Sequence, residues 1–264
     1  MILGFFKRRR RERLRGQPAP PEWRSILARN LSIFRRLPPE DQIELLSHVQ
    51  VFLAEKNIEG CGGLELTDEI RVTIAAQACL LLLHRKTDYY PQLTSILVYP
   101  SGYTVPGARY LGGDVWEEGG EDLLGHTERH LRSLVLAWDA AKHGAADSSD
   151  GQNLVLHEFA HQLDFEDYGT DGAPVLATRT EYLAWAEVMK REFDALRAAE
   201  EAGLPTVLDT YGATNPAEFF AVATEAFFER PRALRDKHRE LYAELARFFR
   251  QDPARFFSER ETIK

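Results

Sequence analysis

The segment Leu154–Asp164 constrains the fold most, because it predicts an apolar helix that carries several ionisable side chains. Its sequence, LVLHEFAHQLD, places His157 and His161 four residues apart. Side chains at this spacing lie one turn apart on the same face of an α-helix. The leucine, valine and phenylalanine residues around them predict that the helix is buried. Burying a His-Glu-His set without partners is costly in free energy, so we expect the fold to bring another polar group to this face.

The same spacing, written HExxH, is typical of a metal site. Two imidazoles one turn apart can both reach a single ion, at zinc–nitrogen distances of about 2.0–2.1 Å. Glu158 is rotated by about 100° along the helix from His157, which is the position of the general base in zinc-dependent peptidases. The alternative is structural: two core histidines with satisfied hydrogen bonds, and a glutamate on the surface.

A catalytic zinc usually takes three protein ligands, and the best candidates for the third lie in residues 209–230. Asn215 and Pro216 predict the start of a helix there. Glu218 falls in its first turn, and Glu225 follows two turns later on the same face. Because this helix is otherwise apolar, two acids on it need an explanation. Ordinary solvated positions are the alternative to metal binding, and spacing alone does not choose between the two glutamates.

The other residues that could bind a metal are scattered along the chain. Cys61 and Cys79 are the only cysteines, which excludes a disulfide-stapled scaffold and a cysteine-rich zinc site. We expect both to pack among apolar residues. His126 and His130 form a second pair four residues apart, but they lie among charged residues ahead of a predicted strand. We interpret these two histidines as exposed.

The charge of the chain is unevenly distributed. Its formal net charge is −8, but residues 7–15 (KRRRRERLR) carry +6, which leaves −14 for the remainder. An acidic body argues against a general nucleic-acid-binding surface, so no direct nucleic-acid partner is expected. No apolar run approaches the roughly 20 residues of a transmembrane helix. The apolar start precedes the basic run, which is the reverse of a secretory signal, and we therefore expect a cytoplasmic protein.

The domain organisation follows from the composition. We predict a basic, proline-rich flexible tail over residues 1–22 and a single domain over residues 23–264, because a chain of 264 residues with 44% hydrophobic residues suits one compact core. Two interpretations of the tail stay open. It is either a solvated, frayed terminus, or a weak contact with an anionic membrane or nucleic acid in which Phe5 and Phe6 add apolar contact.

Periodicity predicts a helix-rich α+β fold with a small mixed β-sheet. The β-branched and aromatic content favours strands over residues 94–99 and 131–138, and the glycine- and acid-rich connection over residues 112–125 predicts an exposed loop. Proline and glycine residues mark the helix boundaries. The predicted helices begin near Trp23, Pro39 and Ile70 and then cover residues 152–164, 179–202, 216–228 and 236–249.

Several blocks of the chain together resemble a known family. HEFAHQLD followed by YGATNPAEFFAVATEAFFERP is similar to the Mlc titration factor A family of bacterial zinc metallopeptidases. Further blocks occur in the same order between about Leu45 and Arg255: GLELTDEIRVTIAAQACLLL, ILVYP, LVLAW and LYAELARFFRQDP. The resemblance implies a zincin-like metallopeptidase domain with one Zn²⁺ per chain. It also implies a metal site similar to that of anthrax toxin lethal factor.

The resemblance assigns roles to individual residues. It implies His157 and His161 as zinc ligands, Glu218 as the third ligand in a gluzincin-like arrangement, Glu158 as the general base, and Tyr211 as a group near the zinc that stabilises the oxyanion. The choice of Glu218 over Glu225 comes from this resemblance. Without it, Tyr211 would be read as a turn tyrosine that packs its ring. Glu225 and Asp164 are then candidates for carboxylates that orient a ligand imidazole.

The function implied is an aminopeptidase-like zinc peptidase that acts on a peptide or protein substrate. In this mechanism Glu158 helps zinc-bound water to attack the peptide bond. The alternative is a regulatory protein that binds and sequesters an Mlc-like transcriptional repressor of sugar-uptake genes, with catalysis secondary. The arginine run is not part of the family pattern, and the third glutamate lies in a different local motif from that of thermolysin. Thermolysin-like substrate preference is therefore not carried over.

Overall fold

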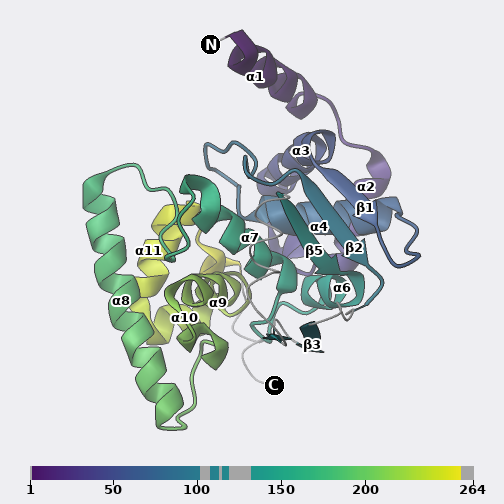
Figure 1. Ribbon diagram of the computed structural model, residues 1–264. Helices are drawn as coiled ribbons and strands as arrows, with labels where there is room; N and C mark the ends of the chain where they lie inside the picture. Colours follow the sequence, from purple (N-terminus) through teal and green to yellow (C-terminus); the bar gives the residue numbers. More distant parts are fainter. Residues whose placement is uncertain (1, 102–107, 113–114, 119–131, 257–264) are drawn as a thin grey trace. The chain divides into compact units, whose positions relative to one another are not determined.

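The apolar periodicity of the sequence corresponds to a helix-rich α+β fold (Figure 1). The computed structural model describes residues 2–101, 108–112, 115–118 and 132–256. Contacts divide the chain into two units. Unit 1 comprises residues 1–83 and 93–146, and unit 2 comprises residues 84–92 and 147–264. The single domain predicted over residues 23–264 stays a prediction.

In unit 1, helices come before, between and after the strands of the sheet along the chain. Residues at the first turn of three of these helices explain where each helix begins. Pro21 and Pro39 occupy first-turn positions of two helices, where a missing N–H costs nothing. The side chain of Thr67 accepts a hydrogen bond from the N–H of Ile70 and caps a third helix. The described helices of unit 1 are α1 (Ile2–Arg15), α2 (Pro21–Asn30), α3 (Pro39–Glu55), α4 (Asp68–Leu80) and α6 (Trp138–Ala146).

The described sheet of unit 1 is small and parallel. Its strands β1 (Asn57–Gly60), β2 (Ser95–Tyr99) and β5 (Ser133–Ala137) lie in the order β1-β2-β5. The helix α4 follows β1 and precedes β2, and a crossover of this kind makes the two strands parallel. A separate antiparallel pair consists of β3 (Ala108–Gly112) and β4 (Val115–Glu118).

The predicted α+β class with a small sheet is confirmed, but the sheet differs from the prediction in detail. Parallel and antiparallel pairs belong to two separate sheets among the described residues, rather than to one mixed sheet. β4 lies inside the loop predicted for residues 112–125, because strand pairing here overrides a composition rich in glycine and acids. The rest of that loop after residue 118, together with His126 and His130, lies outside the described residues.

Two further differences concern helices of the two units. The strand predicted over residues 131–138 ends at Ala137, and the alanine-rich segment that follows forms α6, which periodicity did not predict. The helix predicted over residues 236–249 is α11 (Arg239–Phe249), and a short α10 (Pro231–Lys237) precedes it. Pro231 occupies the first turn of α10 and accounts for this new start.

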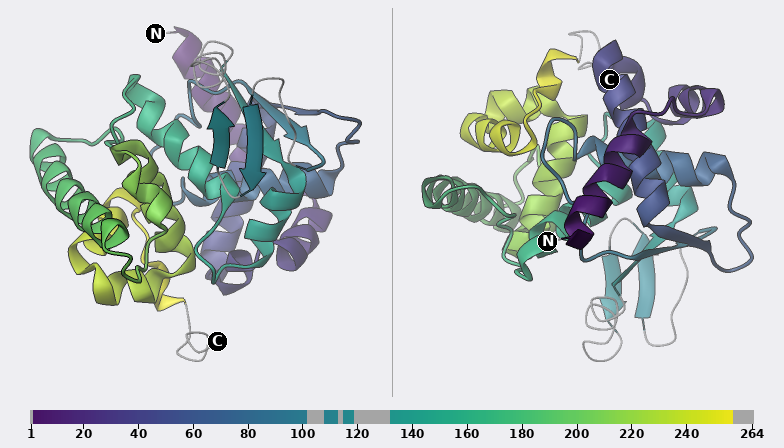
Figure 2. Two further views of the ribbon diagram at one scale, coloured as in Figure 1. Left: turned by 60° about the horizontal axis from the view of Figure 1, so that its bottom comes forward. Right: turned by 90° about the horizontal axis from the view of Figure 1, so that it is seen from above.

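The basic run at the start of the chain is helical over α1. The guanidinium of Arg11 donates to both carboxylate oxygens of Glu55 on α3, at 2.8 and 2.7 Å. Arg10 donates to the carbonyl oxygen of Ala54. Figure 2 shows α1 crossing α3, in agreement with the contacts between the two helices. The sequence did not predict this helix, and the domain boundary proposed at residue 22 stays a prediction.

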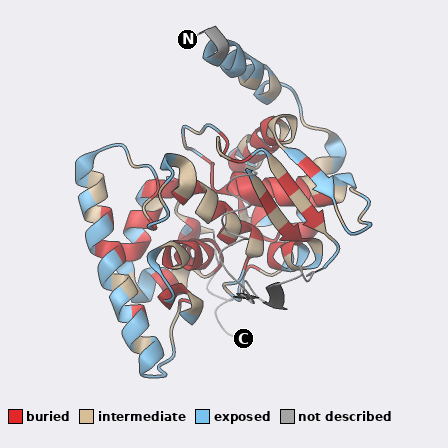
Figure 3. Ribbon diagram, viewed as in Figure 1, coloured by how far each residue is buried: buried red, intermediate tan, exposed pale blue. Residues whose placement is uncertain are grey.

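Unit 2 is built around one buried helix, α9 (Pro216–Glu229), in which every residue from Phe219 to Glu229 is buried (Figure 3). Aromatic rings pack against it, with Trp185 5.5 Å from Phe220 between ring centroids. The other described α-helices of this unit are α7 (Leu154–Asp164), α8 (Arg179–Glu201), α10 and α11. Among the described helices of the chain, none combines the length and the hydropathy that a bilayer crossing requires.

Candidate metal centre

The helix α7 begins with a capped first turn and carries His157 and His161. The side chain of Asn153 accepts a hydrogen bond from the N–H of Leu156 at 3.0 Å, which fixes the first turn. Phe159, one turn before Leu163, packs its ring 4.8 Å from that of Tyr90. His157 is buried and the side chain of His161 is 25% exposed. The pair is therefore shielded from solvent at His157 and accessible to solvent at His161.

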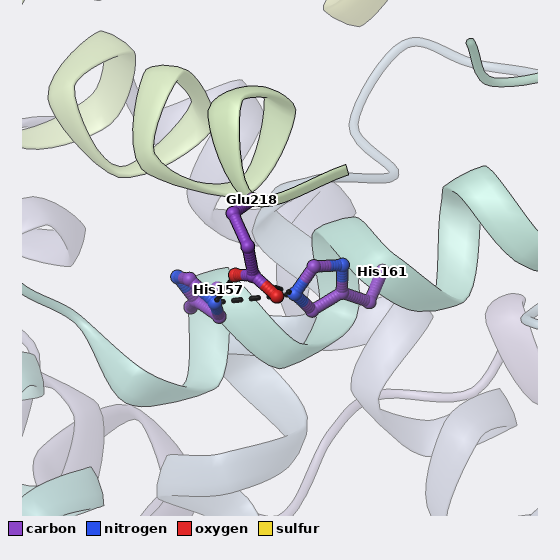
Figure 4. A group of neighbouring side chains, drawn as sticks. All are labelled: His157, His161 and Glu218. Atoms are coloured by element: carbon purple, nitrogen blue, oxygen red, sulfur yellow. Dashed lines mark hydrogen bonds and ion pairs between the residues drawn. The ribbon is translucent and has the colours of Figure 1, made fainter. Parts of the chain in front are cut away.

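The first turn of α9 carries the third polar group. The side chain of Asn215 accepts a hydrogen bond from the N–H of Glu218 at 3.0 Å, and Pro216 occupies the first turn. This cap fixes the backbone of Glu218 at the start of the helix. Figure 4 shows the Glu218 side chain pointing from α9 to the space between His157 and His161 on α7.

Three side-chain atoms converge at this point. The Oε2 atom of Glu218 lies 3.0 Å from Nε2 of His157 and 3.3 Å from Nε2 of His161. The two Nε2 atoms are 3.2 Å apart. A tetrahedral zinc ion with bonds of about 2.0–2.1 Å separates its ligand atoms by about 3.3–3.4 Å. The three distances lie at or up to 0.3 Å below this spacing. The residues form a group that could hold a metal ion.

The chemistry of the donor atoms supports the same reading. Nδ1 of His157 lies 2.8 Å from Oε1 of Glu225. An ionised carboxylate only accepts hydrogen bonds, so we infer that Nδ1 carries the proton and that Nε2 keeps its lone pair. This lone pair faces the carboxylate of Glu218. Two acceptors at this distance repel unless a proton or a cation lies between them. Neutral imidazole and carboxylate are the donor types that zinc accepts.

The ionisation of Glu218 suits a ligand. Burial alone raises the pKa of this carboxyl, but the rings of His157 and His161, when they carry the protons that a metal ion would replace, outweigh burial through hydrogen bonds and charge. Together they hold the pKa of Glu218 well below its usual value. The group is therefore a carboxylate at neutral pH.

Glu225 joins the start of α7 to the imidazole of His157. While Oε1 faces the ring, Oε2 accepts a hydrogen bond from the backbone N–H of Asn153. Both oxygens are therefore used, and the ring is held in one orientation. The structure thus places Glu225, one of the two carboxylates proposed from the sequence to orient an imidazole, in contact with His157.

A second buried glutamate lies one turn further along α9. Oε1 of Glu229 accepts a hydrogen bond from the side-chain amide of Asn153 at 3.0 Å. Burial raises the pKa of Glu229 well above its usual value, and the neighbouring charge of Glu225 adds to this effect. We therefore expect Glu229 to be a neutral acid and Glu225 to carry the charge. The sequence analysis did not single out Glu229. Its hydrogen-bond partner, Asn153, lies 76 residues earlier in the chain, and the apolar residues next to Glu229 do not indicate this contact.

Asp164, the other carboxylate proposed to orient an imidazole, has a different contact. Its Oδ2 accepts a hydrogen bond from the N–H of Gly172 at 3.1 Å, and Oδ1 has no hydrogen-bond partner among the described residues. Burial raises the pKa of this carboxyl. Asp164 therefore holds the loop that contains Gly172. The carbonyl of the same glycine accepts a hydrogen bond from the indole N–H of Trp185 at 2.9 Å.

Gly172 lies directly against the start of α9. Its φ of +76° is in the left-handed region, and a Cβ atom at this position would lie 2.3 Å from the carbonyl oxygen of Pro216. Only glycine fits both conditions. The close approach occurs two residues before Glu218, so this loop helps to position the carboxylate. Sequence reasoning missed Gly172, because the contact is with a segment more than 40 residues away.

The remaining predicted site residues lie beside the three ligand candidates. The N–H of Tyr211 donates to the Asp209 side chain at 2.8 Å in a short 3-10 turn. The Tyr211 ring centroid is 6.1 Å from that of His157. Glu158 follows His157 on α7 and is half-buried.

The two free cysteines belong to unit 1, and burial raises the pKa of the Cys79 thiol.

We expect Glu225→Gln to lower the affinity for Zn²⁺ by about 10- to 100-fold. A glutamine can accept only one of the two hydrogen bonds, so its NH₂ group would face either Asn153 or Nδ1 of His157. Facing the ring, it would move the proton to Nε2, where it blocks the lone pair. Competition with a chelator measures the affinity. Glu229→Gln is the matched control, since a glutamine resembles a neutral acid, and unchanged affinity in both variants would contradict this role of Glu225.

We expect Gly172→Ala to lower both the stability and the Zn²⁺ affinity. The matched control is Gly203→Ala, because Gly203 has a φ of +63° but no atom within 4 Å of its Cβ position. The control should lose about 1 kcal/mol of unfolding free energy from backbone strain alone. Gly172→Ala should lose about 2 kcal/mol more from the clash with Pro216. Denaturant unfolding and metal titration measure the two effects, and equal losses in both variants would contradict the contact.

Comparisons with known proteins match this chain to a metallo-peptidase family. The model of a family described as glucose-regulated metallo-peptidase M90 matches residues 5–250. An uncharacterized protein of Synechocystis sp. is 40% identical over 244 residues, which cover 92% of this chain and 89% of the relative. Mlc titration factor A of Escherichia fergusonii is 30% identical over 249 residues, which cover 88% of this chain and 87% of the relative. Mlc titration factor A of Serratia proteamaculans is 29% identical over 252 residues, with the same coverage.

These matches confirm the resemblance to the Mlc titration factor A family that the sequence blocks indicated. The match to the family model extends well beyond the HExxH segment and includes both α7 and α9. The chain therefore belongs to the glucose-regulated metallo-peptidase M90 family.

Proposed function

We propose that this protein is a zinc-dependent peptidase whose metal ligands are His157, His161 and Glu218. The observation that carries the proposal is the convergence of two imidazole Nε2 atoms and one carboxylate oxygen within 3.0–3.3 Å. Membership of a metallo-peptidase family supports it. The zincin-like character of the domain and a cytoplasmic location are parts of the same proposal.

The chemistry divides between the metal and the protein. A zinc ion held by these three ligands would act as a Lewis acid toward a peptide carbonyl. Glu158 would accept a proton from the attacking water and pass it to the nitrogen of the leaving amine, so that the carboxylate is regenerated. The hydroxyl of Tyr211 would donate a hydrogen bond to the carbonyl oxygen as negative charge develops on it. Glu225 would hold the His157 ring so that its Nε2 lone pair stays available.

The substrates we propose are peptides with a free amino terminus, because the family resemblance implies aminopeptidase-like activity. Aminoacyl chromogenic amides and their N-acetylated counterparts separate this specificity from internal cleavage. Hydrolysis of the free-amine substrates alone would support an aminopeptidase, and equal hydrolysis of both would favour an endopeptidase that uses the same residues.

We expect Glu158→Gln to bind Zn²⁺ normally and to lose catalysis. The amide cannot accept the proton, so kcat should fall by about 10²- to 10⁴-fold. Metal stoichiometry and hydrolysis of a chromogenic peptide amide measure the two properties. Glu187→Gln, an exposed site on α8, is the control for the loss of one negative charge. Full activity in a zinc-loaded Glu158→Gln protein would show that Glu158 is not the base.

A second candidate function is regulatory. It is favoured by the relatives named Mlc titration factor A, which align with 88% of this chain. In this proposal, the protein binds and sequesters an Mlc-like transcriptional repressor, and catalysis is secondary. The repressor would be the partner, and DNA would be affected only indirectly.

Binding to a purified Mlc-like repressor distinguishes the two functions. If regulation is primary, the complex should form with an unchanged Kd after chelation of zinc and in the Glu158→Gln variant. Calorimetry measures the Kd, with Glu187→Gln as the control. Absence of binding by the zinc-loaded wild-type protein would contradict the regulatory function and leave the peptidase proposal unaffected.

A further inference from the structure

The helix α1 has two different faces. Arg11 and Leu14 are half-buried, whereas the other described side chains from Phe5 to Arg15 are exposed. The Arg11 side chain forms its ion pair with Glu55 on α3 at 2.7 Å, and both side chains are largely buried. One face of α1 is therefore fixed to α3, and the helix is held in place rather than free to reorient.

The opposite face combines aromatic and cationic side chains. Phe5, Arg9 and Arg13 follow one another at intervals of four residues, and Phe6 lies within the same half of the helix. The residues Phe5 and Phe6 are 55% and 62% exposed, and their ring centroids lie 6.0 Å apart. The Arg9 guanidinium lies 5.2 Å from the centroid of the Phe5 ring. We call these four residues the outward face of α1.

Charge indicates the kind of partner that fits this face. Residues 7–15 carry +6, with Glu12 as their only acid. Glu55 and Glu44 on α3 pair with Arg11 and Arg15, which leaves a net +4 on this part of the helix. A cationic surface of this density attracts an anionic one. Exposed phenylalanine rings beside arginines suit a partner that offers both phosphate groups and an apolar layer. A bilayer interface offers both, because rings enter the acyl boundary while arginines stay at the headgroups.

We propose that the outward face of α1 binds the surface of a membrane that contains anionic lipids. Phe5 and Phe6 enter the interface, and Arg9 and Arg13 contact lipid phosphates. Lipid is favoured over nucleic acid because one side of the Phe5 ring already carries a guanidinium, which leaves less of the ring for base stacking. The proposal concerns a helix lying on the membrane, and it does not depend on the function proposed for the metal centre.

Vesicle binding by the full-length, zinc-loaded protein tests this inference. We expect co-sedimentation with phosphatidylcholine vesicles that contain phosphatidylglycerol, and little with phosphatidylcholine alone. Each arginine near an anionic surface strengthens binding about fivefold, so Arg9→Gln/Arg13→Gln should weaken it about 25-fold. Phe5→Ser/Phe6→Ser should weaken it at least tenfold and keep the wild-type salt dependence, whereas the arginine variant should lose part of that dependence.

Matched controls carry the same changes at exposed sites of unit 2. Arg179→Gln/Arg239→Gln removes two positive charges, and Leu183→Ser/Leu204→Ser removes two exposed apolar side chains. Both should bind vesicles like the wild type. Equal binding to neutral vesicles, or equal weakening in the controls, would overturn the proposal. Binding to single-stranded DNA without vesicle binding, lost in Arg9→Gln/Arg13→Gln, would overturn it in favour of a nucleic-acid contact.

Discussion

The convergence of two imidazole nitrogens and one carboxylate oxygen between α7 and α9 is the constraint on which the structure of unit 2 depends. Nε2 of His157, Nε2 of His161 and Oε2 of Glu218 lie within 3.3 Å of one another. With both ring protons on Nδ1, these three atoms only accept hydrogen bonds, and such atoms repel one another without a positive charge among them. In that tautomer the arrangement is unfavourable without an ion, which supports the proposed cation site. The rest of the local structure serves to hold these atoms in place.

Each of the surrounding contacts fixes one part of the arrangement. Asn153 and Asn215 cap the two helices, so their first turns do not fray. Gly172 allows a loop to lie against the start of α9. Glu225 uses one oxygen for the His157 ring and the other for the Asn153 N–H. The orientation of the imidazole is thus coupled to the start of the helix that carries it, and disturbing one disturbs the other.

The sequence predicted the parts of this site that depend on local signals. The HExxH spacing and the Asn-Pro pair before Glu218 define the helices α7 and α9 within a few residues of their observed bounds. It did not choose between Glu218 and Glu225 without the family resemblance, because both lie on one face of α9. The Glu225–His157 and Gly172–Pro216 contacts join segments far apart in the chain. Periodicity carries no signal for such contacts.

The difference between local signals and contacts of distant segments also explains where the observed fold departs from the predicted one. The strand β2 has the β-branched and aromatic residues that predict a strand, whereas the four-residue β1 lacks such a signal and is defined by its pairing with β2. A run of arginines predicts a frayed tail, because like charges repel along a helix. In the structure, Arg11 pairs with Glu55, and the tertiary contact offsets that repulsion for a helix that would otherwise be marginal.

The helix α9 buries two glutamates, Glu225 and Glu229, in a core that is otherwise mostly apolar. Composition alone does not explain how both acids are tolerated there. Burying two carboxylates one turn apart would be prohibitive if both were charged. In the structure Glu225 accepts hydrogen bonds from Asn153 and His157, while burial raises the pKa of Glu229 and favours its neutral form. One acid can then carry the charge that keeps the proton on Nδ1 of His157. The other fills the space beneath it and holds the cap residue Asn153. An apolar residue at position 229 would fill the same space but leave the Asn153 amide without its acceptor, which explains why a residue with a side-chain acceptor is found in this core.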